Sequence, residues 1–100
     1  MKKVNQVKNQ WQTKETAQLF KAIAKIGTTR QAEQFIRDLC TLDEIYEMAR
    51  RWQAVRMINQ GKSYREIAAK TGLSTTTVTR VAYWLNYGEG GYRAILKKTK

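Results

Sequence analysis

The sequence has no histidine, no proline and only one cysteine, Cys40. The absence of histidine removes the commonest metal ligand and the commonest general acid or base at neutral pH. A lone cysteine can build neither a disulfide framework nor a cysteine-based metal site. The acids Asp43, Glu44 and Glu47 could suggest a catalytic cluster, but acids are also favoured at a helix start by the helix dipole. We therefore expect no enzymatic activity and no bound metal ion.

Long apolar runs are missing as well. No stretch of the 100 residues approaches the about 20 apolar residues that a membrane-spanning helix needs. The polar segment that follows Met1-Lys2-Lys3 does not resemble a signal peptide. We therefore expect a cytoplasmic protein that contacts no membrane. The length fits one domain, which we place at residues 11–100, after a flexible N-terminal arm at residues 1–10.

Acidic residues are few, and the basic residues are unevenly distributed. Eight acidic residues oppose 19 basic ones, which gives a net charge of +11. Residues 48–88 hold seven basic residues and one acidic residue, a balance of +6, whereas residues 1–47 hold eight and six, a balance of +2. Many soluble proteins are simply basic, but positive charge concentrated in one stretch is typical of a surface that binds nucleic acid.

Apolar residues recur at helical spacing along the chain, and this periodicity indicates helices. Sequences typical of a capping box mark three helix starts, at Thr28, Thr41 and Ser63. Glycines should end the helices that precede them, and Gly27 is expected to do so in a left-handed conformation. The pattern predicts an all-α fold of six helices. The first should cover about residues 13–26, and the last, about residues 92–98, should bury at most Ile95 and Leu96.

The segment at about residues 63–85 has the spacing of a helix-turn-helix. Ala68 is small where two helices would cross, and Gly72 tolerates the positive φ that the turn needs. Three apolar residues would fill the angle between the helices: Leu73, Val78 and Val81. A plain helical hairpin would use the same core residues, so the core alone does not indicate a function.

The outer face of the second of these helices favours DNA binding. It carries hydroxyl groups and one guanidinium and no acid: Ser74, Thr75, Thr76, Thr79 and Arg80. Hydroxyl groups and arginine suit base edges and phosphates, and a threonine methyl can contact a thymine methyl. We predict that Thr75, Thr76 and Thr79 approach the bases of double-stranded DNA and that Ser74 caps the helix. The predicted phosphate anchors are Lys62, Arg65 and Lys70.

Several motifs together resemble the tryptophan repressor superfamily, especially its Trp-repressor-related branch. The resemblance covers about residues 13–96 and rests on Thr41–Glu44, Arg51, Gly61, Ser63–Ile67, Gly72 and Thr77–Arg80. It implies a Trp-repressor-like regulator of transcription, a repressor in the bacterial cytoplasm and nucleoid. It also implies an interwound homodimer, in which the first three helices and the last helix of each chain interlock. The two helix-turn-helix units of such a dimer would then contact successive major grooves about 34 Å apart on a pseudo-palindromic DNA site.

The resemblance also raises the question of a tryptophan corepressor. In the family's namesake the corepressor's indole ring lies between two arginines, which match Arg51 and Arg80, and pocket hydroxyl residues match Thr41 and Thr77. Two small pocket residues of the namesake are replaced here by Val81 and Trp84, which add bulk.

We hypothesise that Trp84 or Val81 fills this vestigial pocket, so that free tryptophan is not used. The protein would then bind DNA without a corepressor or sense another small molecule. Arg51 and Arg80 could equally be phosphate contacts or exposed charges.

Two other functions fit the same helix pair. A protein-interaction module that docks a partner such as polymerase would show no selective DNA binding. A non-specific nucleic-acid binder would show steep salt sensitivity with little sequence preference. Four aromatic residues could be imagined as a base-stacking platform for single strands: Tyr64, Tyr83, Trp84 and Tyr87. Their helical spacing instead favours packing in the core or in a dimer.

Overall fold

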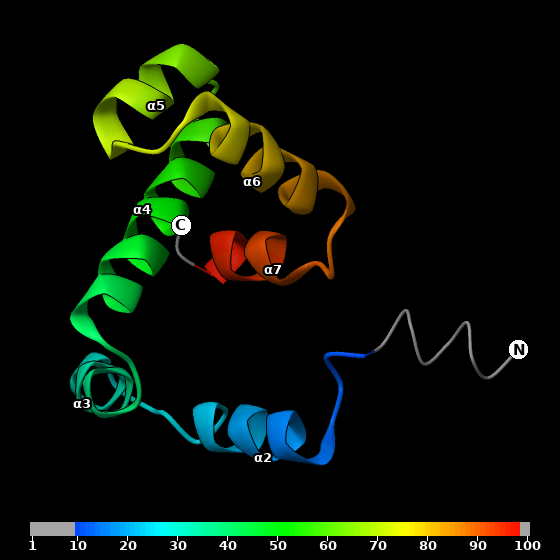
Figure 1. Ribbon diagram of the computed structural model, residues 1–100. Helices are drawn as coiled ribbons and strands as arrows, with labels where there is room; N and C mark the ends of the chain where they lie inside the picture. Colours follow the sequence, from blue (N-terminus) through cyan, green and yellow to red (C-terminus); the bar gives the residue numbers. More distant parts are fainter. Residues whose placement is uncertain (1–9, 99–100) are drawn as a thin grey trace, which may run out of the picture. The chain divides into compact units, whose positions relative to one another are not determined.

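The computed structural model describes residues 10–98, which form six helices and no strand (Figure 1). The helices are α2 (Lys14–Ile23), α3 (Thr29–Leu39), α4 (Leu42–Asn59), α5 (Tyr64–Thr71), α6 (Thr75–Tyr87) and α7 (Gly91–Lys98). The predicted all-α class is therefore confirmed. None of these described helices is long and apolar enough to cross a membrane.

The chain divides into two compact units, one ending at Leu39 and one beginning at Cys40. The arm predicted at residues 1–10 lies outside the described residues, apart from residue 10. The single domain expected at residues 11–100 stays a prediction.

The first unit consists of two amphipathic helices without a core of their own. α2 begins at a capping box in which Thr13 and Thr16 satisfy each other's backbone N–H groups. Neither α2 nor α3 contains a buried residue. Phe20 is 48% exposed and meets Trp11 edge-on, with the ring centroids 5.9 Å apart. Large apolar side chains of this unit therefore stay in contact with solvent in the single chain.

The connection between α2 and α3 differs from the prediction. α2 ends at Ile23 with Ala24 as its C-cap, and Gly27 does not have a positive φ. The chain instead tightens, because the N–H groups of Lys25 and Ile26 bond to carbonyls three residues back. The Gln31 side chain then accepts a hydrogen bond from the Gly27 N–H at 2.9 Å, not from the Thr28 N–H that a full capping box requires. The left-handed stop at Gly27 was therefore a wrong prediction.

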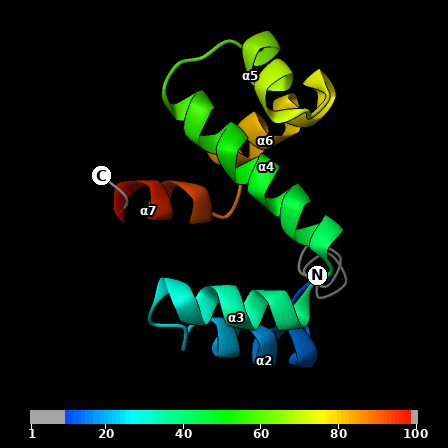
Figure 2. The same ribbon diagram turned by 90° about the vertical axis from the view of Figure 1, so that its left-hand side faces the viewer.

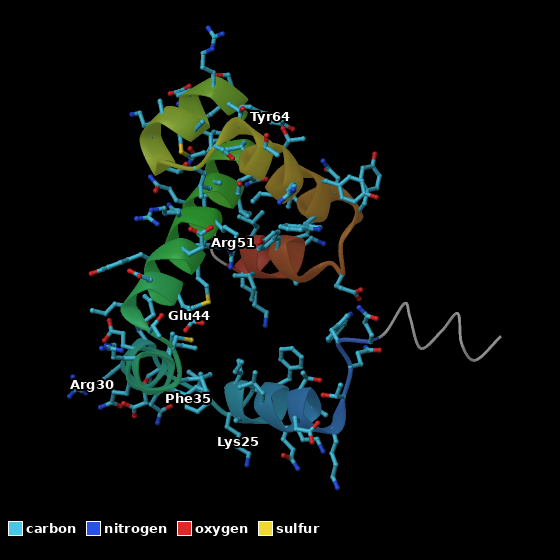
Figure 3. The ribbon with its side chains drawn as sticks, viewed as in Figure 1. Lys25, Arg30, Phe35, Glu44, Arg51 and Tyr64 are labelled. Carbon is cyan, nitrogen blue, oxygen red and sulfur yellow. The ribbon has the colours of Figure 1, made fainter. Side chains whose placement is uncertain are left out.

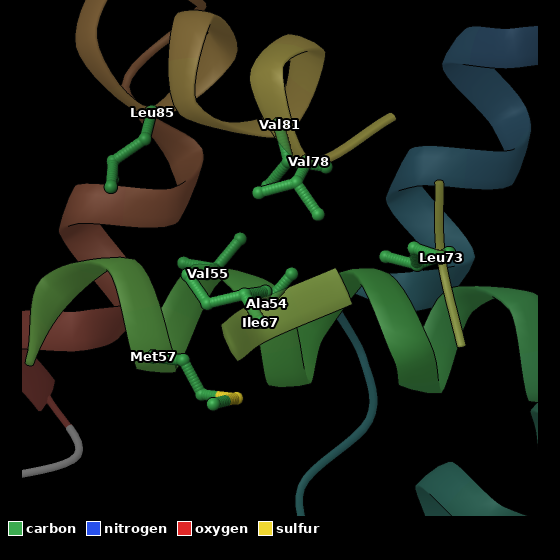
Figure 4. Close-up of a cluster of buried hydrophobic side chains, with 8 residues drawn as sticks. All are labelled: Ala54, Val55, Met57, Ile67, Leu73, Val78, Val81 and Leu85. Atoms are coloured by element: carbon green, nitrogen blue, oxygen red, sulfur yellow. The ribbon is translucent and has the colours of Figure 1, made fainter. Parts of the chain in front are cut away.

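In the second unit, α5 and α6 pack across the second half of α4 (Figures 1 and 2). Figure 4 shows the cluster of buried side chains that joins these three helices, namely Ala54, Val55, Met57, Ile67, Leu73, Val78, Val81 and Leu85. The cluster includes Leu73, Val78 and Val81, which were predicted to fill the angle between the two helices. The largest fully buried side chains are Ile67, Val55, Val78 and Val81.

α7 covers one side of this core with only two side chains. Tyr92 and Leu96 pack against the buried cluster, as expected for residues four apart on one face of a helix. Ile95 lies off that face and is 47% exposed. This agrees with the prediction that α7 buries at most Ile95 and Leu96, because only Leu96 of the two packs against the core.

Candidate nucleic-acid interface

The turn between α5 and α6 is held by local hydrogen bonds. α5 ends at Gly72, which has a φ of +79° and donates its N–H to the carbonyl of Ala68 at 2.9 Å. The buried Thr71 hydroxyl donates to the Ile67 carbonyl at 2.7 Å and accepts from the Leu73 N–H at 3.2 Å. Thr71 therefore ties the end of α5 to the first residue after the turn. Sequence reasoning missed this role, although a threonine directly before the turn glycine is a usable signal.

Serine side chains start both helices of the pair. The Ser63 hydroxyl accepts from the Glu66 N–H at 3.1 Å at the start of α5. At the start of α6, the Ser74 hydroxyl accepts from the Thr77 N–H and donates to the Thr77 hydroxyl oxygen, both at 3.0 Å. Ser74 thus caps α6 as predicted. Its predicted contact with DNA is a separate matter and stays a prediction.

The outer face of α6 begins with exposed threonines. Thr75, Thr76 and Thr79 are all exposed. The Thr79 hydroxyl donates to the Thr75 carbonyl at 2.9 Å, which fixes its hydrogen and leaves its oxygen and its methyl group to the solvent. This turn of α6 therefore offers hydrogen-bond acceptors and methyl groups on a helix whose opposite face is locked into the core.

Four basic side chains stand around this helix pair without an acidic partner. Lys62, Arg65, Lys70 and Arg80 are all exposed, and none forms an ion pair with a residue in the range 10–98. Lys62 precedes α5, whereas Arg65 and Lys70 lie in its first and last turns. Cations that no carboxylate neutralises are available to a polyanion. The predicted phosphate anchors Lys62, Arg65 and Lys70 therefore lie on α5 and just before it, and Arg80 adds a cation on α6.

The residues of the hypothesised ligand pocket have different surroundings. Arg51, labelled on α4 in Figure 3, is half-buried and bonds the Glu47 carboxylate at 3.3 Å. Arg50 lies 3.7 Å from the same carboxylate. Thr41 caps α4 and exchanges two hydrogen bonds with Glu44, at 2.8 and 3.1 Å. Arg51 is therefore charge-paired within its own helix, whereas Arg80 is not paired among the described residues.

Val81 and Trp84 occupy separate environments. Val81 is fully buried in the core beneath α6. Trp84 is 46% exposed and lines an open, largely apolar cleft of about 680 Å³. The other walls of this cleft are Trp52, Gly88, Glu89, Gly91, Tyr92 and Ile95. Trp84 is therefore the bulky replacement that faces open space, and Val81 is not.

No described group of three or more histidine, cysteine, aspartate or glutamate side chains could hold a metal ion. The features that remain are a rigid helix pair, an acid-free outer face and unpaired cations. Such an arrangement can present hydrogen-bond donors and positive charge to another molecule.

The chain is similar to a known protein family and to a protein from another organism. Residues 14–100 match the family described as Trp repressor protein. A relative from Bacillus subtilis (strain 168), called uncharacterized protein YerC, is 39% identical over 87 residues, which are 87% of this chain and 84% of the relative.

Two crystal structures are also similar. A TrpR-like protein from Eubacterium eligens has a TM-score of 0.83 and 36% identity, over 91% of this chain and 94% of that one. A structure from Staphylococcus aureus has a TM-score of 0.82 and 34% identity, over 91% of each chain.

Proposed function

Because this chain belongs to the Trp repressor family of DNA-binding regulators, we propose that it is a sequence-specific transcriptional repressor that binds double-stranded DNA. In this proposal α6 enters the major groove with its N-terminal end, and Thr75, Thr76 and Thr79 approach base edges. Lys62, Arg65, Lys70 and Arg80 contact phosphates on either side. The protein works in the bacterial cytoplasm on chromosomal DNA.

The single observation that carries the proposal is the charge and chemistry of α6 and its flanks. An ordinary solvated helix face mixes acidic and basic residues, whereas the outer face of α6 has no acid. The four exposed cations of the helix pair have no acidic partner within residues 10–98. On such a surface the cations attract the DNA phosphates, and the neutral hydroxyl groups can contact the bases.

The proposal is tested by the salt dependence of DNA binding. Wild-type protein is titrated against a labelled mixed-sequence duplex at several salt concentrations. A triple variant, Lys62→Gln/Arg65→Gln/Lys70→Gln, should bind more weakly, and its log–log salt slope should be shallower by about three for each bound protomer, because each phosphate contact contributes about one unit.

A charge-matched control separates local contacts from net charge. The variant Lys14→Gln/Lys21→Gln/Lys25→Gln removes the same three charges from α2 and its C-terminal flank and should keep the wild-type slope. Equal losses in the two triple variants would contradict the proposed interface. A wild-type protein that binds no duplex would favour a protein-interaction module instead.

A homodimer is the second part of the proposal. Both α2 and α3 are amphipathic and bury no residue in the single chain. Trp11, Phe20 and Ile23 are each more than one third exposed, and apolar surface of this extent is favourably covered by another protein surface. A second copy would supply that cover and would add a second helix-turn-helix, as a two-fold symmetric DNA site requires.

The third part of the proposal is that tryptophan is not the effector. Trp84 places an indole of the protein itself beside the cleft, and the Arg51 guanidinium is already paired with Glu47. An indole held between Arg51 and Arg80 would have to compete with Glu47 for Arg51. Calorimetry of the wild-type protein with tryptophan should give no heat of binding at micromolar affinity. Saturable micromolar binding would show that the site takes tryptophan in spite of Trp84.

A further inference from the structure

Two tyrosines near the C-terminal end of α6 have no role in the core. Tyr83 is 60% exposed and Tyr87 is 73% exposed. Their rings pack against each other with centroids 5.0 Å apart and an interplanar angle of 44°. The single chain therefore does not bury these two rings in its core, and their packing in a dimer stays a prediction. Two exposed aromatic rings that adjoin on one helix form an exposed apolar patch. Such a patch suggests an interaction with another molecule.

The two tyrosines continue the stripe of threonines that starts α6. Thr75, Thr79, Tyr83 and Tyr87 follow one another at four-residue intervals, so each is a neighbour of the next on the helix surface. Helical side chains lean towards the N-terminal end of their helix. Tyr83 therefore leans towards the turn of Thr79, and the Tyr87 ring packs against the Tyr83 ring. Tyr83 and Tyr87 lie on the face of α6 that is opposite to its buried residues.

The depth of the major groove determines which part of the DNA Tyr83 would contact. A helix that enters N-terminus first places Thr75 near the base edges, and Tyr83 follows about 12 Å further along the axis. The groove is only about 8.5 Å deep. Tyr83 would thus lie at the level of the sugar-phosphate backbone, where a phenol hydroxyl can donate a hydrogen bond to a phosphate oxygen. The outer face of α6 offers no carboxylate that would repel that phosphate.

We propose that the Tyr83 hydroxyl donates a hydrogen bond to a DNA phosphate at the edge of the major groove, and that the Tyr87 ring holds Tyr83 in position for it. This inference rests on the proposed DNA binding and adds a neutral contact to the cationic ones. It extends the interface from the first turns of α6 towards its C-terminal end.

The inference is tested by removing one hydroxyl. Tyr83→Phe should weaken binding to a chosen duplex by about tenfold or more, because a hydrogen bond to a charged acceptor is lost while the ring stays. The salt slope should not change, because no charge is removed. Tyr46→Phe, which removes the hydroxyl of an exposed tyrosine on α4, is the matched control and should bind as the wild type does.

The positioning role of Tyr87 is tested by a double-mutant cycle. Tyr87→Phe keeps the supporting ring and should bind normally, whereas Tyr87→Ala should lose about as much affinity as Tyr83→Phe. Adding Tyr87→Ala to Tyr83→Phe should cost little more, because both changes remove the same contact. Circular dichroism checks that each variant stays folded.

Three outcomes would overturn the inference. If Tyr83→Phe binds as the wild type does while Lys70→Gln weakens binding, Tyr83 makes no phosphate contact and the proposed function stands. If Tyr83→Phe weakens self-association in sedimentation and not DNA affinity, the tyrosines form a protein interface. If the wild type binds no duplex, the proposed function fails first.

Discussion

The residue types at the start of α6 favour contact over helix stability. Threonine is a weak helix former, and each of Thr75, Thr76 and Thr77 lowers helix stability by a few tenths of a kcal/mol relative to alanine, about 1–2 kcal/mol together. The Ser74 cap offsets about 1 kcal/mol of this cost. A helix selected for stability alone would not need three consecutive threonines. The exposure of Thr75 and Thr76 is consistent with a surface that contacts a ligand.

Thr79 and Lys70 should have separable effects on DNA binding. Thr79→Ala removes a methyl group and a hydroxyl oxygen from the outer face, so it should change base preference at one position of the site by about 1 kcal/mol or more. Lys70→Gln should weaken all sequences alike and reduce the salt slope by about one for each bound protomer. Affinities for a panel of single-base-substituted duplexes distinguish the two. Identical profiles would contradict this division of roles.

At the scale of the element, the turn between α5 and α6 depends on one glycine. The φ of Gly72 is +79°, and a Cβ atom added there would meet nothing within 4 Å. A substitution should therefore act through backbone strain and not through a clash.

Gly72→Ala should lower the free energy of unfolding by about 1–2 kcal/mol, the cost of a left-handed conformation in a residue with a side chain. Gly91→Ala is the matched control, because Gly91 has open space around its Cα and no positive φ, and it should be neutral or slightly stabilising. Urea unfolding measures both. Equal effects would show that strain at Gly72 is not what defines this turn.

The starts of helices were predictable from the sequence because capping is local. Thr41 with Glu44, and Ser74 with Thr77, form within three residues and need no tertiary contact. The end of α2 was not predictable in the same way. Gly27 can be left-handed, but the Gln31 side chain captures its N–H in another conformation, and a pattern of residue types does not rank such competing bonds.

The candidate site, like the helix boundaries, was predictable from the sequence only in part. Periodicity identified the buried face of α6, and therefore also its outer face, because the two faces are complementary. It could not show that Glu47 neutralises Arg51, or that Val81 belongs to the core while Trp84 lines a cleft. Those facts depend on side-chain conformation and on how α4, α6 and α7 pack.

At the scale of the whole molecule, the two units differ in how much they bury. The second unit has a core of its own, whereas α2 and α3 have no buried residue. Helices of 10 and 11 residues are marginal in water when nothing packs against their apolar faces. Association of two copies would stabilise both helices and would make stability depend on protein concentration.

Dilution should therefore lower the Tm of the protein. Phe20→Asp should give monomers in sedimentation and a Tm that no longer depends on concentration, because it places a charge on the apolar face of α2. Gln18→Asp introduces the same acid at an exposed polar position of α2 and should leave the dimer intact. A Tm that does not change with dilution of the wild type, or an equal loss of dimer in both variants, would contradict the proposed homodimer.

The most direct test of the central claim is selection of genomic DNA fragments by the purified protein. It is done at about physiological salt, in excess competitor DNA, with and without added tryptophan. A sequence-specific homodimer that reads DNA through α6 predicts enrichment of a short two-fold-symmetric sequence, with half-sites about one helical turn apart, and the same sequence in both conditions. Enrichment that requires tryptophan would overturn the account of Trp84. No enrichment in either condition would contradict sequence-specific DNA binding itself.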